Sequence, residues 1–205
     1  MSRSRLVMIG TVVSIVAAFG VAPAAQAAEN YFLTFQTTSG APLQGIAGES
    51  KDAFFSDRGA VELNSFDWSA QNPVTFGSGV PAPGKTKLNR LSVDKHVDSA
   101  SPALFQRMAT GTHIPRMVLY VRRAGPTGTA ATGNGSTGGA YLQYQFAPVF
   151  VASVSPSGDG EQMRERVTFE YGAVKQTYWP TSADGTVFRT PLDASWNQVT
   201  DTATL

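Results

Sequence analysis

Two long stretches in the second half of the chain alternate apolar and polar residues, and in each the apolar positions change parity partway along. The apolar residues are Leu142, Tyr144, Phe146, Val149 and Val151 in the first stretch and Val167, Phe169, Tyr171, Ala173, Val174 and Tyr178 in the second. A two-residue period is typical of a strand with one buried face, so a change of parity moves the buried face to the other side. The changes fall near Pro148 and Gly172, and strands that bend in this way are typical of barrels and orthogonal sandwiches. We therefore expect a mainly β protein whose compact β-barrel is made of two sheets.

Two further strands are predicted in the first half of the chain. Tyr31, Leu33 and Phe35 define one face of an amino-terminal strand. Over residues 61–71 the apolar residues are Val61, Leu63, Phe66, Trp68 and Ala70. Their parity changes across Asn64 and Ser65, and one extra residue in a strand has this effect, so we expect a β-bulge there.

One short α-helix is predicted to flank the barrel. Ser101 is the expected N-cap, Pro102 takes the first helical position and Gly111 ends the helix. The apolar residues of this helix are Leu104, Phe105 and Met108. Strand signals resume at residues 117–121, where apolar residues occupy both faces. Because such a strand needs cover on both sides, we expect the helix or a neighbouring subunit to cover its outer face.

The first 27 residues have the pattern of a cleavable secretory signal peptide. Arg3 and Arg5 precede an apolar run over residues 6–21, and Ala25 and Ala27 occupy the −3 and −1 positions that signal peptidase reads. A transmembrane anchor is the alternative, but the run is shorter than the roughly 20 residues that a spanning helix needs. We expect a single exported domain over residues 28–205, secreted or extracellular, or periplasmic where the host has an outer membrane.

The charge balance and the lack of cysteine exclude several classes of function. The chain has 16 basic and 15 acidic residues, and removal of Arg3 and Arg5 leaves 14 basic residues against 15 acidic ones, a net charge of −1. No overall field therefore attracts nucleic acid or an anionic membrane. Without cysteine, thiol chemistry and cysteine metal sites are excluded, and the domain must be held by burial and hydrogen bonding, helped by association.

The sequence contains no recognisable catalytic constellation. Its two histidines are His96, at a predicted strand end, and His113, in the turn after the helix, and both are interpreted as ordinary polar residues. The motifs of serine hydrolases, zinc proteases and P-loop proteins do not occur. The carboxylates considered as candidate pairs are Glu49, Asp52, Asp57, Glu62, Asp67, Asp159 and Glu161. We interpret them as solvated charges, so the protein is predicted to be no enzyme and to bind no cofactor or metal.

Several polar segments are predicted to lie at the surface. The alternating charges of residues 164–170 are interpreted as the solvent-exposed face of a strand whose other face carries Val167 and Phe169. Residues 45–59 are predicted to form an extended polar loop. Residues 127–139 are small and uncharged and are predicted to form a mobile hairpin tip. This segment contains a glycosylation sequon at Asn134. Trp179 and Trp196 lie outside the strand alternation and are the candidates for surface contacts.

Seven short strings of residues occur in a specific order along the chain. They are residues 48–52 (GESKD), 66–69 (FDWS), 91–98 (LSVDKHVD), 111–115 (GTHIP), 121–125 (VRRAG), 151–154 (VASV) and 165–169 (ERVTF). No single string is diagnostic. The ordered set, which covers about residues 31–196, resembles the haemolysin-coregulated protein (Hcp) family, the tube proteins of the type VI secretion system.

This resemblance implies an assembly function. It implies an Hcp-like compact barrel of two sheets with one flanking helix, which forms a hexameric ring; stacked rings form a tube whose lumen can carry small effector proteins. Glu49, Ser50, Lys51 and Asp52 are the candidates for a subunit interface, because their loop is polar, extended and matched to the family string. A cleavable signal peptide would export such a subunit outside the injection machine. The alternative is a secreted monomeric binding module that recognises a glycan or a protein through the 45–59 loop or exposed tryptophans.

Overall fold

A computed structural model describes residues 28–76, 82–124, 137–158, 160–180 and 190–205. The predicted signal peptide lies outside these residues, as do Asp159 and residues 127–136 with the sequon at Asn134. Within the described ranges, no helix has the length and apolar character needed to cross a membrane.

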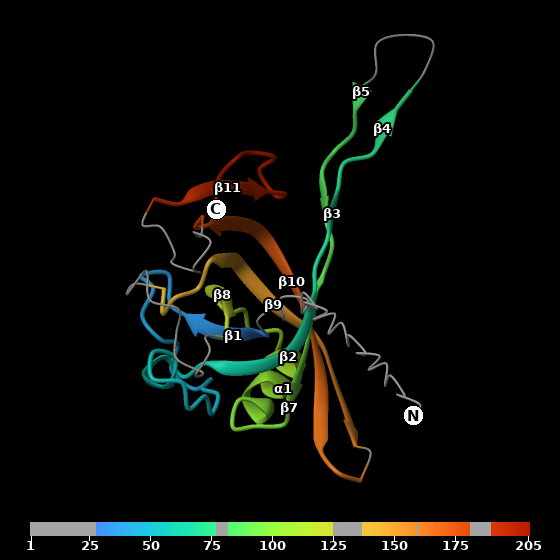
Figure 1. Cartoon of the computed structure of the whole chain (residues 1–205). Coiled ribbons are helices and arrows are strands. Elements are labelled where there is room, and N and C mark those ends of the chain that lie inside the picture. The colour runs from blue at the N-terminus through green and yellow to red at the C-terminus, as the bar shows by residue number, and fades with distance from the viewer. Residues whose placement is uncertain (1–27, 77–81, 125–136, 159, 181–189) are drawn as a thin grey trace, which may run out of the picture.

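Seven antiparallel strands form the main sheet, and six of them close into a barrel (Figure 1). The strands of this sheet are β1 (Glu29–Gln36), β2 (Val61–Asp67), β7 (Leu91–His96), β8 (Arg116–Arg123), β9 (Leu142–Gly158), β10 (Met163–Tyr178) and β11 (Leu192–Asn197). Their order is β11-β10-β7-β2-β1-β8-β9, and β9 pairs back onto β10. The prediction of a mainly β barrel is confirmed, but the two predicted sheets are one closed sheet, because β9 and β10 pair along almost their whole length.

The bend in β10 lies where this strand exchanges one neighbour for another. Residues 164–169 pair with β7, whereas residues 173–178 pair with β11. The register against β9 shifts between Thr168 and Phe169. An added Cβ at Gly172 would lie 3.1 Å from Cδ of Pro148, so the two positions predicted to bend pack against each other. The bulge predicted in β2 is also confirmed, because its pairing with β7 shifts register between Leu63 and Ser65.

The barrel interior forms one apolar core, and α1 (Ser101–Thr110) closes it on the β9 side. The largest side chains in this core that are almost fully buried are Leu33, Phe35, Val61, Leu91, Leu104, Ile114, Met117, Leu119, Phe146 and Phe169. Each side chain of this size stabilises the fold by about 1.5–3 kcal/mol through removal of apolar surface from water. A cavity at Leu104 is therefore expected to loosen the helix from the barrel.

The helix begins at Ser101, one residue earlier than predicted, and its start is held in a different way. Ala100 occupies the cap position and makes no side-chain hydrogen bond there, while the Ser101 side chain is buried. Oδ1 of Asp98 accepts the Ala100 amide at 3.0 Å and thereby fixes the turn before the helix. Gly111 ends the helix with φ of 66°, as predicted. Phe105 does not face the core, because its side chain is exposed.

The outer face of β8 is covered by the chain's own loop between β1 and β2. Val118 and Tyr120 pack there on Phe55 and Ala60, next to Phe32 of β1. The rings of Phe32 and Phe55 are stacked with their centroids 4.0 Å apart. The loop also contains a short 3-10 helix, η1 (Ser56–Arg58). The sequence predicted that the helix or a neighbouring subunit would cover this face, and the structure corrects that prediction.

The end of the predicted hairpin tip at residues 127–139 is not exposed. Residues 137–140 are buried. Ala140 belongs to the apolar cluster that Phe55 forms with the outer face of β8. Gly138 has φ of 61°, and a Cβ added there would clash with the ring of Phe54. The small residues at this end of the segment therefore allow a close approach between two loops.

A narrow two-stranded arm projects from the barrel between β2 and β7 (Figure 1). In it β3 (Ala70–Gln71) pairs with β6 (Lys87–Leu88), and β4 (Val74–Thr75) pairs with β5 (Ala82–Pro83). The sequence predicted one strand over residues 61–71 and no arm. The main-sheet strand ends at Asp67, after which the chain leaves the barrel.

Candidate assembly surfaces

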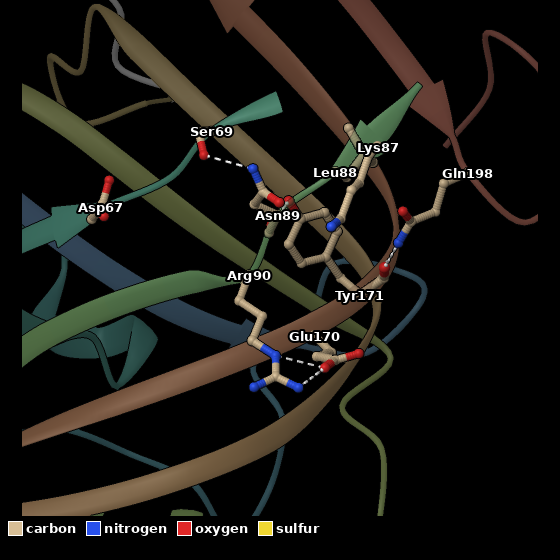
Figure 2. Close-up of a pocket in the computed structure, with 9 residues that line it drawn as sticks. All are labelled: Asp67, Ser69, Lys87, Leu88, Asn89, Arg90, Glu170, Tyr171 and Gln198. Carbon is tan, nitrogen blue, oxygen red and sulfur yellow. Dashed lines mark hydrogen bonds and ion pairs between the residues drawn. The ribbon is translucent and has the colours of Figure 1, made fainter. Parts of the chain in front are cut away.

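A polar pocket lies at the base of the arm (Figure 2). Its volume is about 570 Å³, and its lining residues are Asp67, Ser69, Lys87, Leu88, Asn89, Arg90, Glu170, Tyr171 and Gln198. Two carboxylates balance two cations in this lining. Sites that bind small molecules are lined mostly by apolar residues. This pocket is lined mostly by polar residues, which come from both the arm and the barrel. We therefore interpret it as the joint between the arm and the barrel.

Tyr171 of β10 is the centre of this joint. Its hydroxyl donates to the backbone oxygen of Asn89 at 2.7 Å and accepts a hydrogen bond from Nε1 of Trp68. Its ring lies 4.6 Å from that of Phe146, centroid to centroid. Burial raises the pKa of Tyr171 to about 12, although the hydrogen bond from Trp68 acts in the opposite direction. The hydroxyl therefore stays protonated across the physiological range and can donate to Asn89.

Apolar side chains are exposed at the arm and on the helix side of the barrel. On the arm, Phe76 is 81% exposed and Val74 is 47% exposed. Phe105 of α1 is 58% exposed, and Phe150 of β9, whose ring lies near His113, is also exposed. The arm and α1 lie at opposite ends of the barrel in Figure 1. Large exposed apolar side chains are common at surfaces that bind another protein.

Three of the four predicted interface residues make side-chain contacts within the chain. Ser50 is buried, and its hydroxyl donates to Oε1 of Glu62 at 2.7 Å. Asp52 forms an ion pair with the buried Arg122. Glu49 and Lys51 are exposed, and Oε1 of Glu49 accepts the amide of Ser99 at 3.0 Å. Glu49 and Lys51 are thus the members of this set with the most exposed side chains.

The Asp52–Arg122 pair fastens the loop to the barrel. The Arg122 guanidinium lies over the ring of Phe32, with its central carbon 4.8 Å from the ring centroid. Burial acts to raise the pKa of Asp52, but the hydrogen bonds from Arg122 and from the amides of Phe54 and Phe55 outweigh it and hold the pKa below its usual value. A charged Asp52 is thus part of the folded loop.

A second buried ion cluster joins β7, β10 and the start of α1. Nζ of Lys95 lies 2.8 Å from Oε1 of Glu165 and 2.7 Å from Oδ1 of Asp98, and it donates to the Ser101 hydroxyl at 3.0 Å. The prediction that Glu165 lies on the solvent-exposed face of its strand is wrong, because its side chain is buried. Glu165 has the same parity as Val167 and therefore points inward, whereas Arg166 on the outer face pairs with Asp94.

The histidines and carboxylates considered for catalysis are dispersed. His96 and His113 are exposed on different elements, and Asp57, Glu62 and Asp67 are exposed as predicted. The described ranges contain no group of three or more His, Cys, Asp or Glu residues able to hold a metal ion. The site therefore offers contacts and ion pairs, and its described residues assemble no reaction centre.

The two tryptophans predicted to make surface contacts are not free surface residues. Trp179 is buried, with 6% of its surface exposed, and its amide donates to the backbone oxygen of Tyr141 at 2.8 Å. Trp196 is half-buried and packs against the core. A stacking platform for a sugar ring is thus not formed by this pair.

The fold is that of a closed six-stranded β-barrel protein with a projecting arm. The family model for "Type VI secretion system effector, Hcp" matches residues 35–178. The chain is 31% identical to protein hcp1 of Pseudomonas aeruginosa over 157 residues, which cover 74% of this chain and 89% of that protein. The chain belongs to the Hcp family of the type VI secretion system.

Solved structures agree with this assignment. Hcp1 from Salmonella typhimurium is 31% identical, with a TM-score of 0.62, and the match covers 86% of this chain and 99% of that one. Hcp2 from the same organism is 26% identical, with a TM-score of 0.56, over 84% of this chain and 98% of that one. A structure described as a type six secretion system protein, at 24% identity and a TM-score of 0.70, shares the fold over 85% of this chain and 99% of its own.

Family membership settles the class of function. Hcp proteins are non-enzymatic tube proteins that form hexameric rings and are secreted by the type VI system. The predicted resemblance and the predicted lack of enzymatic activity are therefore confirmed. Sequence reasoning missed the arm, the Tyr171 joint and the Lys95 cluster. The parity of Glu165 with Val167 was the available signal for the last of these.

Proposed function

We propose that the mature domain, residues 28–205, is the subunit of a hexameric ring and that these rings stack into a tube. Support comes from the match of this chain to 99% of the length of Hcp1 from Salmonella typhimurium at 31% identity. A closed ring uses a head-to-tail interface, so each subunit needs two different complementary patches. The exposed apolar residues of the arm and of α1 are two separate candidate patches.

The arm is the proposed contact with another copy. Phe76 and Val74 would each remove apolar surface from water on contact, at about 25 cal/mol per Å². The polar loop contributes Glu49 and Lys51 as the second proposed contact, while Ser50 and Asp52 hold the loop's shape from within. We propose that small effector proteins occupy the lumen of the ring. No nucleic acid and no membrane are expected as partners of the mature domain.

The proposed route of export is the general secretory pathway, which would deliver the subunit to the extracellular space or to the periplasm. Support comes from the leader pattern that ends at Ala27 and from β1, which begins at Glu29. Cleavage at the predicted site would thus leave almost no residues before the first strand. Mass spectrometry of protein from the culture supernatant tests this proposal, with Ala28 as the expected first residue. Recovery of the intact chain from the cytosol alone would contradict it.

Multi-angle light scattering of the purified mature domain tests the ring. We expect a monodisperse hexamer, and electron microscopy is expected to show rings and short tubes. A monodisperse monomer at high micromolar concentration would contradict ring formation and favour the binding-module alternative. The buried Trp179 and half-buried Trp196 give that alternative no tryptophan surface.

A further inference from the structure

The direction of the arm has to be fixed at its base. A two-stranded ribbon without a packed face is marginally stable, and it cannot fix its own angle to the barrel. The chain enters the arm after Asp67 and returns to the barrel at Leu91. Trp68 lies between β2 and β3 on the outgoing leg, and Asn89 lies between β6 and β7 on the returning leg (Figure 2 shows Asn89). Whatever holds these two residues therefore sets the direction of the arm.

One hydroxyl contacts both legs. The Tyr171 oxygen accepts from Nε1 of Trp68 and donates to the backbone oxygen of Asn89 at 2.7 Å. A hydroxyl has one proton and two lone pairs, so the indole donor directs the single proton toward Asn89. Two segments 21 residues apart in sequence are thereby tied to a single atom of β10.

Tyr171 is itself rigidly held. Its side chain is buried against Phe146, and its backbone oxygen accepts Nε2 of Gln198 at 2.7 Å. It lies next to Gly172, between the residues of β10 that pair with β7 and those that pair with β11. The fixed end of the joint is therefore the barrel wall.

The neighbouring polar contacts constrain the arm less. Arg90 and Glu170 form an ion pair, but their side chains are 63% and 53% exposed, and such surface pairs stabilise little. Nδ2 of Asn89 donates to the Ser69 hydroxyl at 2.9 Å, which joins the legs to each other and not to the barrel. Trp68 also packs on Tyr144, an apolar contact that holds the leg without setting a direction as sharply as a hydrogen bond.

We propose that Tyr171 is the positioning residue that fixes the angle between the arm and the barrel. This inference rests on the proposed function only in its consequence, namely that a fixed arm is ready to contact another subunit. A preorganised contact binds more tightly because less conformational freedom is lost on association. The Tyr171 hydroxyl thus acts on assembly without touching the partner.

The lack of cysteine makes a direct test possible. Lys85→Cys on the arm and Gln106→Cys on α1 are both at exposed positions and would carry two spin labels. Labelled protein is diluted into excess unlabelled protein, so that pulsed dipolar spectroscopy reads distances within one subunit. We expect a narrow distribution for the unmodified joint. For Tyr171→Phe we expect a distribution at least about twofold wider, because the hydrogen bonds to both legs of the arm are lost and other arm angles become populated.

Tyr144→Phe is the matched control, because the Tyr144 ring also packs on Trp68 while the hydroxyl of Tyr171 stays in place. The distribution of this control is expected to stay narrow. Equal widths for Tyr171→Phe and Tyr144→Phe would overturn the proposal. If Tyr171→Phe fails to fold, Trp68→Phe replaces it, because this change keeps an aromatic ring and removes the indole donor. It is expected to widen the distance distribution. A narrow distribution in a folded Trp68→Phe would also overturn the proposal.

Sedimentation velocity on the same variants separates the two proposals. We expect the midpoint concentration of assembly to rise about tenfold for Tyr171→Phe, because the two hydrogen bonds that organise the arm are lost, and to be unchanged for Tyr144→Phe. A wild-type protein that stays monomeric would contradict the proposed function, and the spin-label widths would still decide the role of Tyr171. Unchanged widths with normal assembly would contradict the role of Tyr171 alone.

Discussion

Nζ of Lys95 lies 2.8 Å from Oε1 of Glu165, and the two side chains are only 1% and 3% exposed. A charge in this position is tolerated because each side chain neutralises the other, and Asp98 and Ser101 complete the hydrogen bonding. The pair joins two strands of the barrel to the turn before α1. Its two members are therefore expected to be strongly coupled in stability.

Removal of one member of this pair is expected to destabilise the fold by about 3–5 kcal/mol, because the other charge is left buried. Lys95→Met and Glu165→Leu test this by urea unfolding. The double variant is expected to be more stable than the sum of the single changes predicts, because neither charge then remains unpaired within this pair. Strictly additive effects in the double-mutant cycle would show that the two side chains are not coupled.

The Asp52–Arg122 pair is expected to make stability sensitive to acid. The pKa of Asp52 in the folded protein is below its ordinary value of 3.8. The contribution of Asp52 to stability is therefore fully present above that value and is lost as the pH falls through the folded pKa. The free energy of unfolding of Asp52→Asn should therefore approach that of the wild type on acidification. Chemical unfolding from pH 7 to pH 2 measures this difference. Asp57→Asn, an exposed change in the same loop, is the control and should differ little from wild type throughout.

Tyr171 is expected to make stability sensitive to alkali. Its pKa is raised from 10.0 to about 12 in the folded protein, so the contribution of the protonated hydroxyl is full below pH 10 and is lost as the pH rises toward 12. Thermal unfolding between pH 8 and pH 12 should show a steeper loss for the wild type than for Tyr171→Phe. Parallel curves for the two proteins would contradict the assignment of this titration to Tyr171.

The segment 127–139 is expected to divide into two parts in deletion experiments. Replacement of residues 127–136 by a short Gly-Ser linker should change the melting temperature little, because loop length affects closure entropy only weakly. A replacement that extends through Gly139 should be clearly destabilising, because it removes the buried residues next to Phe54 and Arg122. Gly138→Ala should show part of the same loss, owing to its φ of 61° and the clash with Phe54. Equal melting temperatures for the two deletions would show that residues 137–139 do not contribute to stability.

The exposed pair Glu49 and Lys51 is expected to contribute to assembly. Glu49→Ala combined with Lys51→Ala should shift the oligomer toward monomer in light scattering. The melting temperature of the monomer should fall only slightly, because the one intrachain hydrogen bond that is lost, from the Ser99 amide to Glu49, is exposed. Asp57→Ala with Glu62→Gln changes charges in the same region and serves as a comparison. An unchanged oligomer in the first variant would remove this loop from the interface.

The sequence alone determined the class of fold, the family and much of the strand pattern. A two-residue period, a parity change at Asn64 and Ser65, and a helix stopped by Gly111 depend on interactions between residues close in the chain, which local patterns record. The helix position and the bends at Pro148 and Gly172 were predicted for the same reason.

Only the tertiary structure decided which surfaces cover one another. The outer face of β8 is apolar because the loop that carries Phe55 packs on it. Glu165 is buried because it pairs with Lys95, which lies 70 residues away on another strand. The joint at Tyr171 likewise needs Trp68 and Asn89, which lie about half a chain away in sequence but within hydrogen-bonding distance in space. An apolar or charged side chain in the sequence does not specify its partner, because closure of the barrel sets which distant residues meet.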